Sequence, residues 1–193
     1  AVLLKTLSTT TFTNCNHTFT VGQKVRLGDL TSRWVTMGYR REESVEIPGT
    51  FSVRGGIIDI FSPNSLLPAR LDLTNNEIET IHFFDPATQR SMENANTIRV
   101  TVAQEILPLY ADQKRVSDLV SAMRFTDCST DTYQRIEDDL ASLFSGHGEE
   151  DLSFYNGLIN QTSILEYLDP PNLIILDGKT NIESEATDLE TRI

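Results

Sequence analysis

Apolar and polar residues alternate through much of residues 45–102, and this pattern predicts an antiparallel β-sheet. In the opening strand Phe51, Val53 and Ile57 are expected to share one side, while Arg54 points to the other. The period of two therefore predicts a sheet with one apolar side and one side on which an arginine is displayed.

Two adjacent glycines, Gly55 and Gly56, interrupt this strand pattern. Glycine within a strand indicates a bulge or a place where another backbone approaches closely. Further along, residues 69–85 predict a hairpin with Asn75 and Asn76 at its tip, because asparagine tolerates positive φ. The sheet is thus expected to be built from hairpins.

The first strand of that second hairpin divides its residues between two sides in the same way. Leu71 and Leu73 are expected to face one side, and Arg70 and Asp72 the other. Such alternation is typical of a strand with one side on the core.

Three arginines of this region could form one positive patch. Taken separately, Arg54, Arg70 and Arg40 are each most simply explained as solvated side chains. Taken together on one sheet of an acidic protein, they could form a patch with Asp72 at its rim. Arginine suits a protein interface because its planar fork can pair with a carboxylate through two hydrogen bonds.

A helix is expected before the sheet. Asp29 is predicted to cap its amino end, and Leu30, Trp34 and Met37 follow at helical spacing. Gly38 then supplies a left-handed stop.

After the sheet, the pattern changes to helices and one apolar run. The second of two further helices is expected to begin near Thr130 and to stop at Gly146. Residues 163–168 (SILEYL) predict a short helix, closed by the prolines that follow. Residues 172–177 (NLIILD) predict a strand buried on both faces, as in a parallel sheet covered by helices. Both ends of the chain resemble cuts through a longer polypeptide.

Composition adds an acidic surface to this picture. Asp and Glu number 28 against 16 Lys and Arg, which gives a formal net charge of -12. Such a surface repels phosphate backbones unless its basic residues are concentrated. General nucleic-acid binding by this chain is therefore not expected. The 39% of hydrophobic residues among 193 suffice for the core of one large or two small domains.

Cysteine usage and hydropathy indicate the compartment. Cys15 and Cys128 match no disulfide or zinc spacing, which favours a reducing cytosol. No apolar run approaches the roughly 18 residues of a membrane helix, and no signal-peptide pattern opens the chain. The expectation is a cytoplasmic protein with no membrane partner.

Few residues point to chemistry. No phosphate loop with the spacing G-x-x-x-x-G-K-[ST] is present, so no nucleotide site, cofactor or catalytic residue is expected within this chain. Residues 15–17 (CNH) could give two metal ligands. The other candidates, His82, His147 and Cys128, belong to separate elements without zinc spacing, which favours scattered polar residues over a metal site.

Asp59 is unusual because isoleucines flank it. An acid in this setting is expected to be buried and to pair with a neighbouring arginine. Catalysis by the same residue is the less favoured alternative, since few other functional groups surround it.

A family resemblance covers most of these features. It is carried by residues 38–63 (GYRREESVEIPGTFSVRGGIIDIFSP), residues 67–91 (LPARLDLTNNEIETIHFFDPATQRS) and the later AQEILP of residues 103–108. This succession resembles the UvrA-binding domain shared by the excision-repair protein UvrB and the bacterial transcription-repair coupling factors (Mfd). Residues 154–177 (FYNGLINQTSILEYLDPPNLIILD) favour the coupling factors, in which a similar segment returns the chain to a UvrB-like base.

The resemblance implies a function. Coupling factors are ATP-driven translocases that remove stalled RNA polymerase from damaged DNA and recruit UvrA. Their polymerase-binding and motor modules, with the ATP and Mg that the motor uses, would lie beyond Ile193. This chain is then a non-catalytic interaction module that recruits UvrA for transcription-coupled nucleotide excision repair. The alternatives are the corresponding region of UvrB itself, or part of an ATP-dependent DNA-processing enzyme whose active site lies outside the chain.

The resemblance also implies site residues. The UvrA-facing surface of UvrB includes arginines that match Arg40, Arg54 and Arg70, and an acid that matches Asp72. UvrB commonly has a further arginine where this chain has Ser52, so the implied set of contacts is smaller here.

The same resemblance implies three segments. Residues 1–26 would end a preceding UvrB-like α/β segment, and residues 27–125 would form the UvrA-binding α+β domain. Residues 126–193 would contain the helices and the buried strand that return to the UvrB-like base. The predicted fold is thus α+β: a twisted antiparallel sheet with flanking helices and partial α/β segments at both ends.

Overall fold

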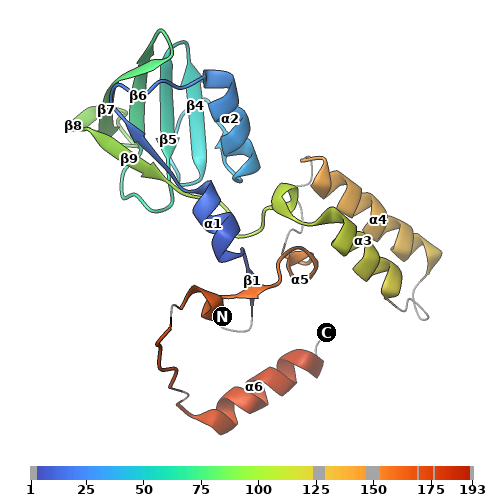
Figure 1. The fold of residues 1–193 in the computed structure, drawn as a ribbon. Helices are drawn as coiled ribbons and strands as arrows, with labels where there is room; N and C mark the ends of the chain where they lie inside the picture. Colours follow the sequence, from blue (N-terminus) through green and yellow to red (C-terminus); the bar gives the residue numbers. More distant parts are fainter. Residues whose placement is uncertain (1–3, 124–128, 147–152, 169, 176, 192–193) are drawn as a thin grey trace.

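A computed structural model describes the chain over residues 4–123, 129–146, 153–168, 170–175 and 177–191. It contains a sheet-bearing unit, a helical hairpin and a C-terminal run that ends in a helix (Figure 1). The elements in chain order are β1 (Lys5–Thr6), α1 (Thr9–Cys15), β2 (His17–Thr20), α2 (Leu27–Thr36), β3 (Arg40–Arg41), β4 (Thr50–Arg54), β5 (Ile57–Phe61), β6 (Ala69–Thr74), β7 (Glu77–Phe84), β8 (Ser91–Ala95), β9 (Thr97–Val100), the 3-10 helix η1 (Pro108–Tyr110), α3 (Gln113–Ala122), α4 (Thr130–Phe144), α5 (Asn156–Ile159), β10 (Thr162–Ser163), the 3-10 helix η2 (Ile164–Tyr167) and α6 (Lys179–Thr191). Helices segregated from a sheet confirm the predicted α+β class.

Six strands form the main sheet, in the order β3-β4-β5-β6-β7-β8. All neighbours are antiparallel except β3 and β4, so the sheet is mixed where the sequence predicts a purely antiparallel one. β3 is two residues long, and Arg40 pairs with Thr50 in parallel register. A strand of two residues is too short to show alternation, so neither its presence nor its direction can be predicted from the sequence pattern.

The hairpin of β4 and β5 turns through the two glycines. Gly55 has φ +63°, which suits the first turn residue of a type II′ hairpin. A Cβ on Gly56 would lie 2.6 Å from the carbonyl oxygen of Leu73, and the Leu73 amide donates to the Gly56 carbonyl at 2.7 Å. The predicted close approach of another backbone is confirmed, and the approaching strand is β6.

The same turn corrects the predicted side of Ile57. Its partner across the hairpin is Arg54, while Val53 pairs with Ile58. Directly paired residues share one side of a sheet. Ile57 therefore lies on the side of Arg54, and 37% of it is exposed. The prediction was wrong because it continued one strand through the glycines, where the chain in fact reverses.

The hairpin of β6 and β7 is confirmed. Asn75 and Asn76 stand at its tip with φ +53° and +64°, the values that a type I′ turn requires. The register shifts between Asp72 and Leu73, where a bulge interrupts the pairing.

The apolar side of the main sheet packs against α2 and against the β2–β9 pair. At its centre Trp34 of α2 is fully buried, with its ring centroid 6.0 Å from that of Phe19 and 5.5 Å from that of Phe51. Buried sheet residues that complete this cluster include Ile58, Ile60, Leu71, Ile78 and Ile81. The helix α2 therefore covers the sheet, and it does so through its predicted apolar stripe.

The start of α2 differs from the prediction. The helix begins at Leu27, with Arg26 as the N-cap residue and no side-chain cap. Asp29 lies within the first turn, where its charge favours the positive end of the helix dipole without capping it. Gly38 has φ +86°, so the predicted left-handed stop is confirmed.

The helices after the sheet form a second, smaller core. α4 begins at Thr130, as predicted, because the Ser129 side chain accepts a hydrogen bond from the Thr132 amide. Leu140 and Leu143 of this helix are buried with residues of α3 and α5. No helix within the described ranges is long and apolar enough to cross a membrane.

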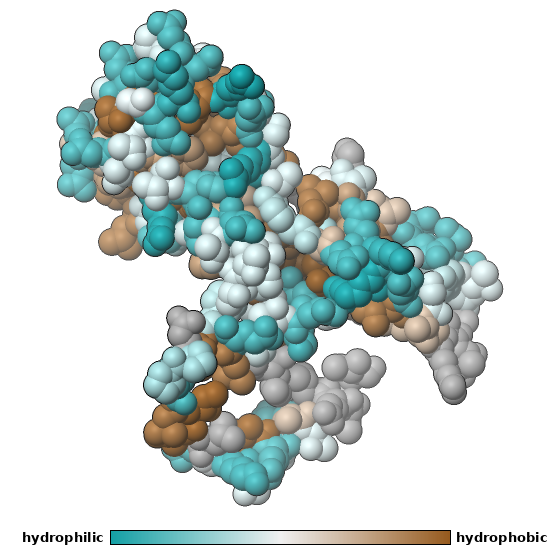
Figure 2. Space-filling model, in the orientation of Figure 1, coloured by the Kyte–Doolittle hydropathy of each residue, from teal (hydrophilic) through white to brown (hydrophobic). Residues whose placement is uncertain are grey.

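The predicted buried strand near the C-terminus is absent from residues 172–175, and residue 176 lies outside the described residues. Leu173 is 84% exposed and Ile175 78% exposed. Apolar surface is visible along this run in Figure 2. A strand buried on both faces needs neighbouring strands and covering helices, and no described element supplies them here. The predicted short helix before it is present as η2, of 3-10 type.

We expect Gly56→Ala to destabilise the protein by about 1–3 kcal/mol, because its Cβ would meet the Leu73 carbonyl oxygen at 2.6 Å. Denaturant unfolding followed by circular dichroism measures the change. The matched control is Gly28→Ala in α2, where a Cβ meets no atom within 4 Å. It should be neutral or stabilising by up to about 1 kcal/mol. Equal stabilities for the two variants would contradict the packing of β6 against the turn.

Candidate functional site

One side of the main sheet is polar in a continuous row. The registers of four strand pairs align Ser52, Asp59, Arg70, His82 and Asn94 across β4 to β8. Paired residues share one side of a sheet, so all five side chains belong to the side opposite the main core. The row therefore brings Asp59 and Arg70, which lie on separate strands, next to each other.

Asp59 is the centre of the row. Its side chain is fully buried, and it accepts hydrogen bonds from Arg70 Nε at 2.6 Å and Arg70 Nη2 at 2.9 Å. Arg54 Nη2 donates to the same carboxylate at 2.6 Å. We refer to these three residues as the arginine–aspartate cluster. The predicted pairing of Asp59 with a neighbouring arginine is confirmed, with two arginines in place of one.

Arg70 is held on two sides. Its guanidinium lies 4.7 Å from the centre of the Phe84 ring, and its side chain is only 17% exposed. The hydrogen bonds to Asp59 are the largest cause that raises the pKa of Arg70 above its ordinary value. The charge–ring contact and the two hydrogen bonds leave this guanidinium little freedom to meet a partner.

Arg54 is the accessible member of the cluster. Its side chain is 54% exposed although its guanidinium reaches the buried carboxylate. Arg54 and Arg70 share one side of the sheet, as predicted, but only Arg54 is displayed on it. The positive surface is therefore smaller than the sequence pattern indicates.

The remaining predicted residues lie at the margins. Arg40 is exposed on β3 and shares the side of its partner Thr50. It lies about 13 Å along the strand direction from Arg54, since Thr50 and Arg54 stand at opposite ends of β4. Asp72 is 35% exposed, and its carboxylate accepts a hydrogen bond from the Thr80 hydroxyl at 2.5 Å. The role of these residues in binding a partner stays a prediction.

The environment of Asp72 also includes a histidine that the sequence pattern does not indicate. His82 Nδ1 lies 3.8 Å from Asp72 Oδ2, and the His82 side chain is 15% exposed. His82 stands beside Arg70 in register because of the bulge in the β6–β7 pairing. If the pairs are counted from the hairpin tip without a bulge, Arg70 is paired with Ile81. The sequence pattern therefore does not place His82 beside Arg70.

The candidate metal ligands do not come together. Within the described ranges no group of three or more His, Cys, Asp or Glu side chains could hold an ion. Cys15 is fully buried in the main core. His17 lies on β2, where burial and then the charge of Arg33 lower its pKa. His147 and Cys128 lie outside the described residues.

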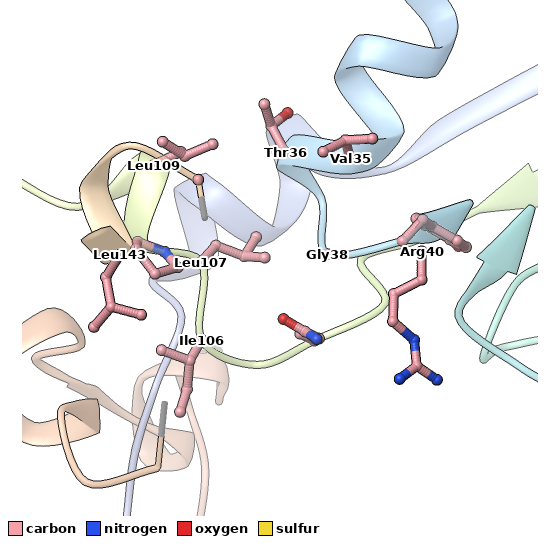
Figure 3. Close-up of a pocket in the computed structure, with 12 residues that line it drawn as sticks. Val35, Thr36, Gly38, Arg40, Ile106, Leu107, Leu109 and Leu143 are labelled. Atoms are coloured by element: carbon pink, nitrogen blue, oxygen red, sulfur yellow. The ribbon is translucent and has the colours of Figure 1, made fainter. Parts of the chain in front are cut away.

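A small pocket of about 100 Å³ lies beside Arg40, between the end of α2 and the end of α4. Figure 3 shows Ile106, Leu107 and Leu143 on one side of it and Arg40 on the other. Among the described residues that line it, Arg40 is the only charged one. The pocket therefore has no group of titratable side chains that could act together.

Comparison with known proteins identifies the sheet-bearing unit. Residues 18–106 match the family model of the UvrB interaction domain. This range contains all strands of the main sheet, the helix α2 that covers it and the arginine–aspartate cluster. The unit is a UvrB interaction domain.

Curated relatives extend the similarity over most of the chain. The transcription-repair-coupling factor of Bacillus subtilis (strain 168) is 29% identical over 180 residues, which cover 88% of this chain and 15% of that protein. The one from Staphylococcus epidermidis (strain RP62A) is 28% identical over 187 residues, 91% of this chain and 16% of that protein. The one from Staphylococcus aureus (strain USA300) is 42% identical over 94 residues, 48% of this chain and 8% of that protein.

The chain is thus similar over most of its length to transcription-repair coupling factors, and its residues 18–106 carry the match to the UvrB interaction domain. It spans less than a fifth of the length of these relatives, 15% and 16% for the two long matches. The resemblance seen in the sequence is confirmed at the level of the family.

Removing Arg70 should be far more damaging to stability than removing Arg54. Arg70→Ala leaves a fully buried carboxylate with a half-exposed arginine and a long hydrogen bond from the Ser52 hydroxyl, and we expect a loss of about 3–5 kcal/mol in the free energy of unfolding. Arg54→Ala leaves both Arg70 contacts in place and should cost about 1 kcal/mol or less. Urea titrations of both variants measure the difference. An Arg70→Ala protein as stable as the parent would contradict the structural role of the pair.

Proposed function

We propose that this chain is a non-catalytic protein-interaction module that recruits UvrA during transcription-coupled nucleotide excision repair. The observation that carries the proposal is Arg54, whose half-exposed side chain is held by a buried carboxylate on the polar side of the segment that matches the UvrB interaction domain. Arg40 and Asp72 flank it on the same side of the sheet and supply further contacts. Arg70 is mostly buried and contributes mainly by holding Asp59 in place.

The charge distribution supports a protein partner. With a formal charge of -12 over the whole chain, a nucleic acid meets repulsion from most directions. A protein surface with a few acidic side chains can pair with Arg54 without approaching the remaining acidic surface. Guanidinium–carboxylate pairs at the centre of an interface contribute strongly to its specificity.

The wider role is what the family resemblance implies for the whole protein, and it stays part of the proposal. In the whole protein, RNA polymerase and DNA would be bound by regions outside this chain, and an ATP- and Mg-dependent motor would lie there as well. The protein would work in the cytoplasm. The module described here would contribute the contact with the repair machinery.

The decisive experiment measures UvrA binding to the parent chain and to Arg54 variants by pull-down and by titration calorimetry. Truncating one member of a desolvated interfacial charge pair typically costs about 2–5 kcal/mol, which corresponds to at least roughly thirtyfold in affinity. We therefore expect Arg54→Ala to bind at least about thirtyfold more weakly. Arg54→Glu should be weaker still, because it adds repulsion to the lost pair.

Two controls accompany these variants. Arg135→Ala removes an exposed arginine from α4, away from the main sheet, and should bind UvrA like the parent. Thermal unfolding checks that Arg54→Ala remains folded at the temperature of the titration. Tight UvrA binding by folded Arg54→Ala would show that this arginine is a solvated bystander.

Binding to duplex DNA should be negligible at physiological salt. The net charge of -12 opposes the phosphate backbone, and the positive surface is limited to a few arginines. A fluorescence-anisotropy titration with a 30-base-pair duplex at several salt concentrations tests this. Micromolar affinity with a steep salt dependence would count against a pure protein-interaction module.

A further inference from the structure

The buried carboxylate of Asp59 fixes one edge of the Arg54 guanidinium. Nη2 of Arg54 donates to Asp59 Oδ2 at 2.6 Å, while more than half of the Arg54 side chain is exposed. Within the described part of the chain, Nε and Nη1 of Arg54 have no hydrogen-bond partner. The guanidinium is therefore held at one nitrogen, and its other donors are available.

We propose that Asp59 is a positioning residue for partner binding: it orients Arg54 so that the free donors of the guanidinium receive a carboxylate of the partner protein. This inference rests on the proposed function, because it assumes that Arg54 contacts UvrA. Asp59 itself is fully buried and touches no partner.

The position of Asp59 is determined by a chain of contacts behind it. Arg70 holds its two carboxylate oxygens through Nε and Nη2, and the ring of Phe84 lies 4.7 Å from the Arg70 guanidinium. The Ser52 hydroxyl stands 3.5 Å from Asp59 Oδ2. A carboxylate held in this way cannot turn with its arginine, and the contact to Arg54 therefore fixes the guanidinium relative to the sheet.

Pre-positioning matters because a free arginine has many rotamers. The conformational entropy of ordering such a side chain opposes binding when the ordering takes place in the complex. In this protein the ordering takes place on folding, through the contact with Asp59. Gly55, next to Arg54, adds open space, since even a Cβ there would meet no atom within 4 Å.

The charges of the cluster identify the group that it fits. Two guanidinium groups and one carboxylate leave a net charge of +1, and Asp72 lies on β6, two residues after Arg70. One carboxylate, from an aspartate or glutamate of the partner, neutralises this charge. A run of phosphates would meet Asp72 and the acidic remainder of the chain.

A double-mutant cycle tests the positioning role through the sign of the effect. Asp59→Asn removes a negative charge beside Arg54, and long-range electrostatics alone would then strengthen binding to an acidic partner. Positioning predicts the opposite, a loss of about tenfold in UvrA affinity, within the range of coupling between contacting residues. In the Arg54→Ala background the same substitution should change the affinity by less than about twofold, because no guanidinium is left to orient.

The outcomes separate this inference from the proposed function. If folded Arg54→Ala binds UvrA as tightly as the parent, the proposed function itself fails. If Arg54→Ala binds weakly but Asp59→Asn strengthens binding, or weakens it equally in both backgrounds, only the positioning role fails. Ile78→Val, which removes one methyl group from the main core on the opposite side of the sheet, is the control for a general loss of stability and should bind like the parent when folded.

A measurement on the parent protein decides the question if Asp59→Asn does not fold. Nuclear magnetic resonance of arginine side chains reports rotation of the guanidinium. Arg54 should show hindered rotation and separate Nη signals in the absence of UvrA. Arg41, exposed on β3, is the reference for a free arginine. Rotation of Arg54 as fast as that of Arg41 would overturn the proposal.

Discussion

A single buried carboxylate organises the polar side of the main sheet. Asp59 is fully buried, and an ionised carboxylate without partners is far too costly to leave in such a place. Arg70 meets that requirement with two hydrogen bonds, and Arg54 adds a third. Since these partners stand on β6 and β4, the charge ties together the two strands that flank β5. The placement of two arginines on this side of the sheet therefore depends on one side chain.

The same requirement explains why three arginines with similar sequence settings have different roles. Arg70 pairs directly with Asp59 across the strands and lies near Phe84, so it is mostly buried. The direct partner of Asp59 on β4 is Ser52, and Arg54 lies two residues further along the strand and reaches Asp59 diagonally, so that about half of its side chain is exposed. Arg40, on the edge strand β3, has no share in the cluster. The alternation within a strand shows only the side of the sheet on which an arginine lies. The distance of that arginine from Asp59 decides whether its side chain is buried, as for Arg70, or exposed at the surface, as for Arg54.

Much of this arrangement could be predicted from the sequence because it depends on periodicity. Alternation within single strands placed Arg54 and Arg70 on one side and indicated that Asp59 pairs with an arginine. The side of Ile57 could not be read in this way, since a two-residue turn changes the count between strands. The bulge in the β6–β7 pairing has a weak signal that was missed. Ile78 and Ile81 are both buried although three residues apart, and only an extra residue between them allows this in a strand.

The exposed run of residues 172–175 shows a different limit. Its composition describes a strand buried on both faces, yet burial needs neighbours, and composition states nothing about where these come from. Local pattern is reliable where the partner is the adjacent hairpin, as for the Asn75–Asn76 tip, and fails where the partner is distant.

Stability alone does not account for the ion cluster beneath the exposed side chain of Arg54. Replacing a buried ion pair by apolar side chains of similar volume is often neutral or stabilising, so a hydrophobic layer could hold β4, β5 and β6 together equally well. Such a layer would offer nothing to the guanidinium of Arg54, which would then be one more mobile side chain on an acidic protein. The main core, built around Trp34 on the opposite side of the sheet, supplies most of the apolar packing, and Phe61 and Phe84 of the polar side form a smaller buried apolar cluster with Val45. Beside this smaller cluster, the polar side holds a buried charge that is joined to an exposed donor. The arrangement of Phe84, Arg70, Asp59 and Arg54 from interior to surface therefore places a fixed donor at the surface, which is what the proposed contact with a partner requires.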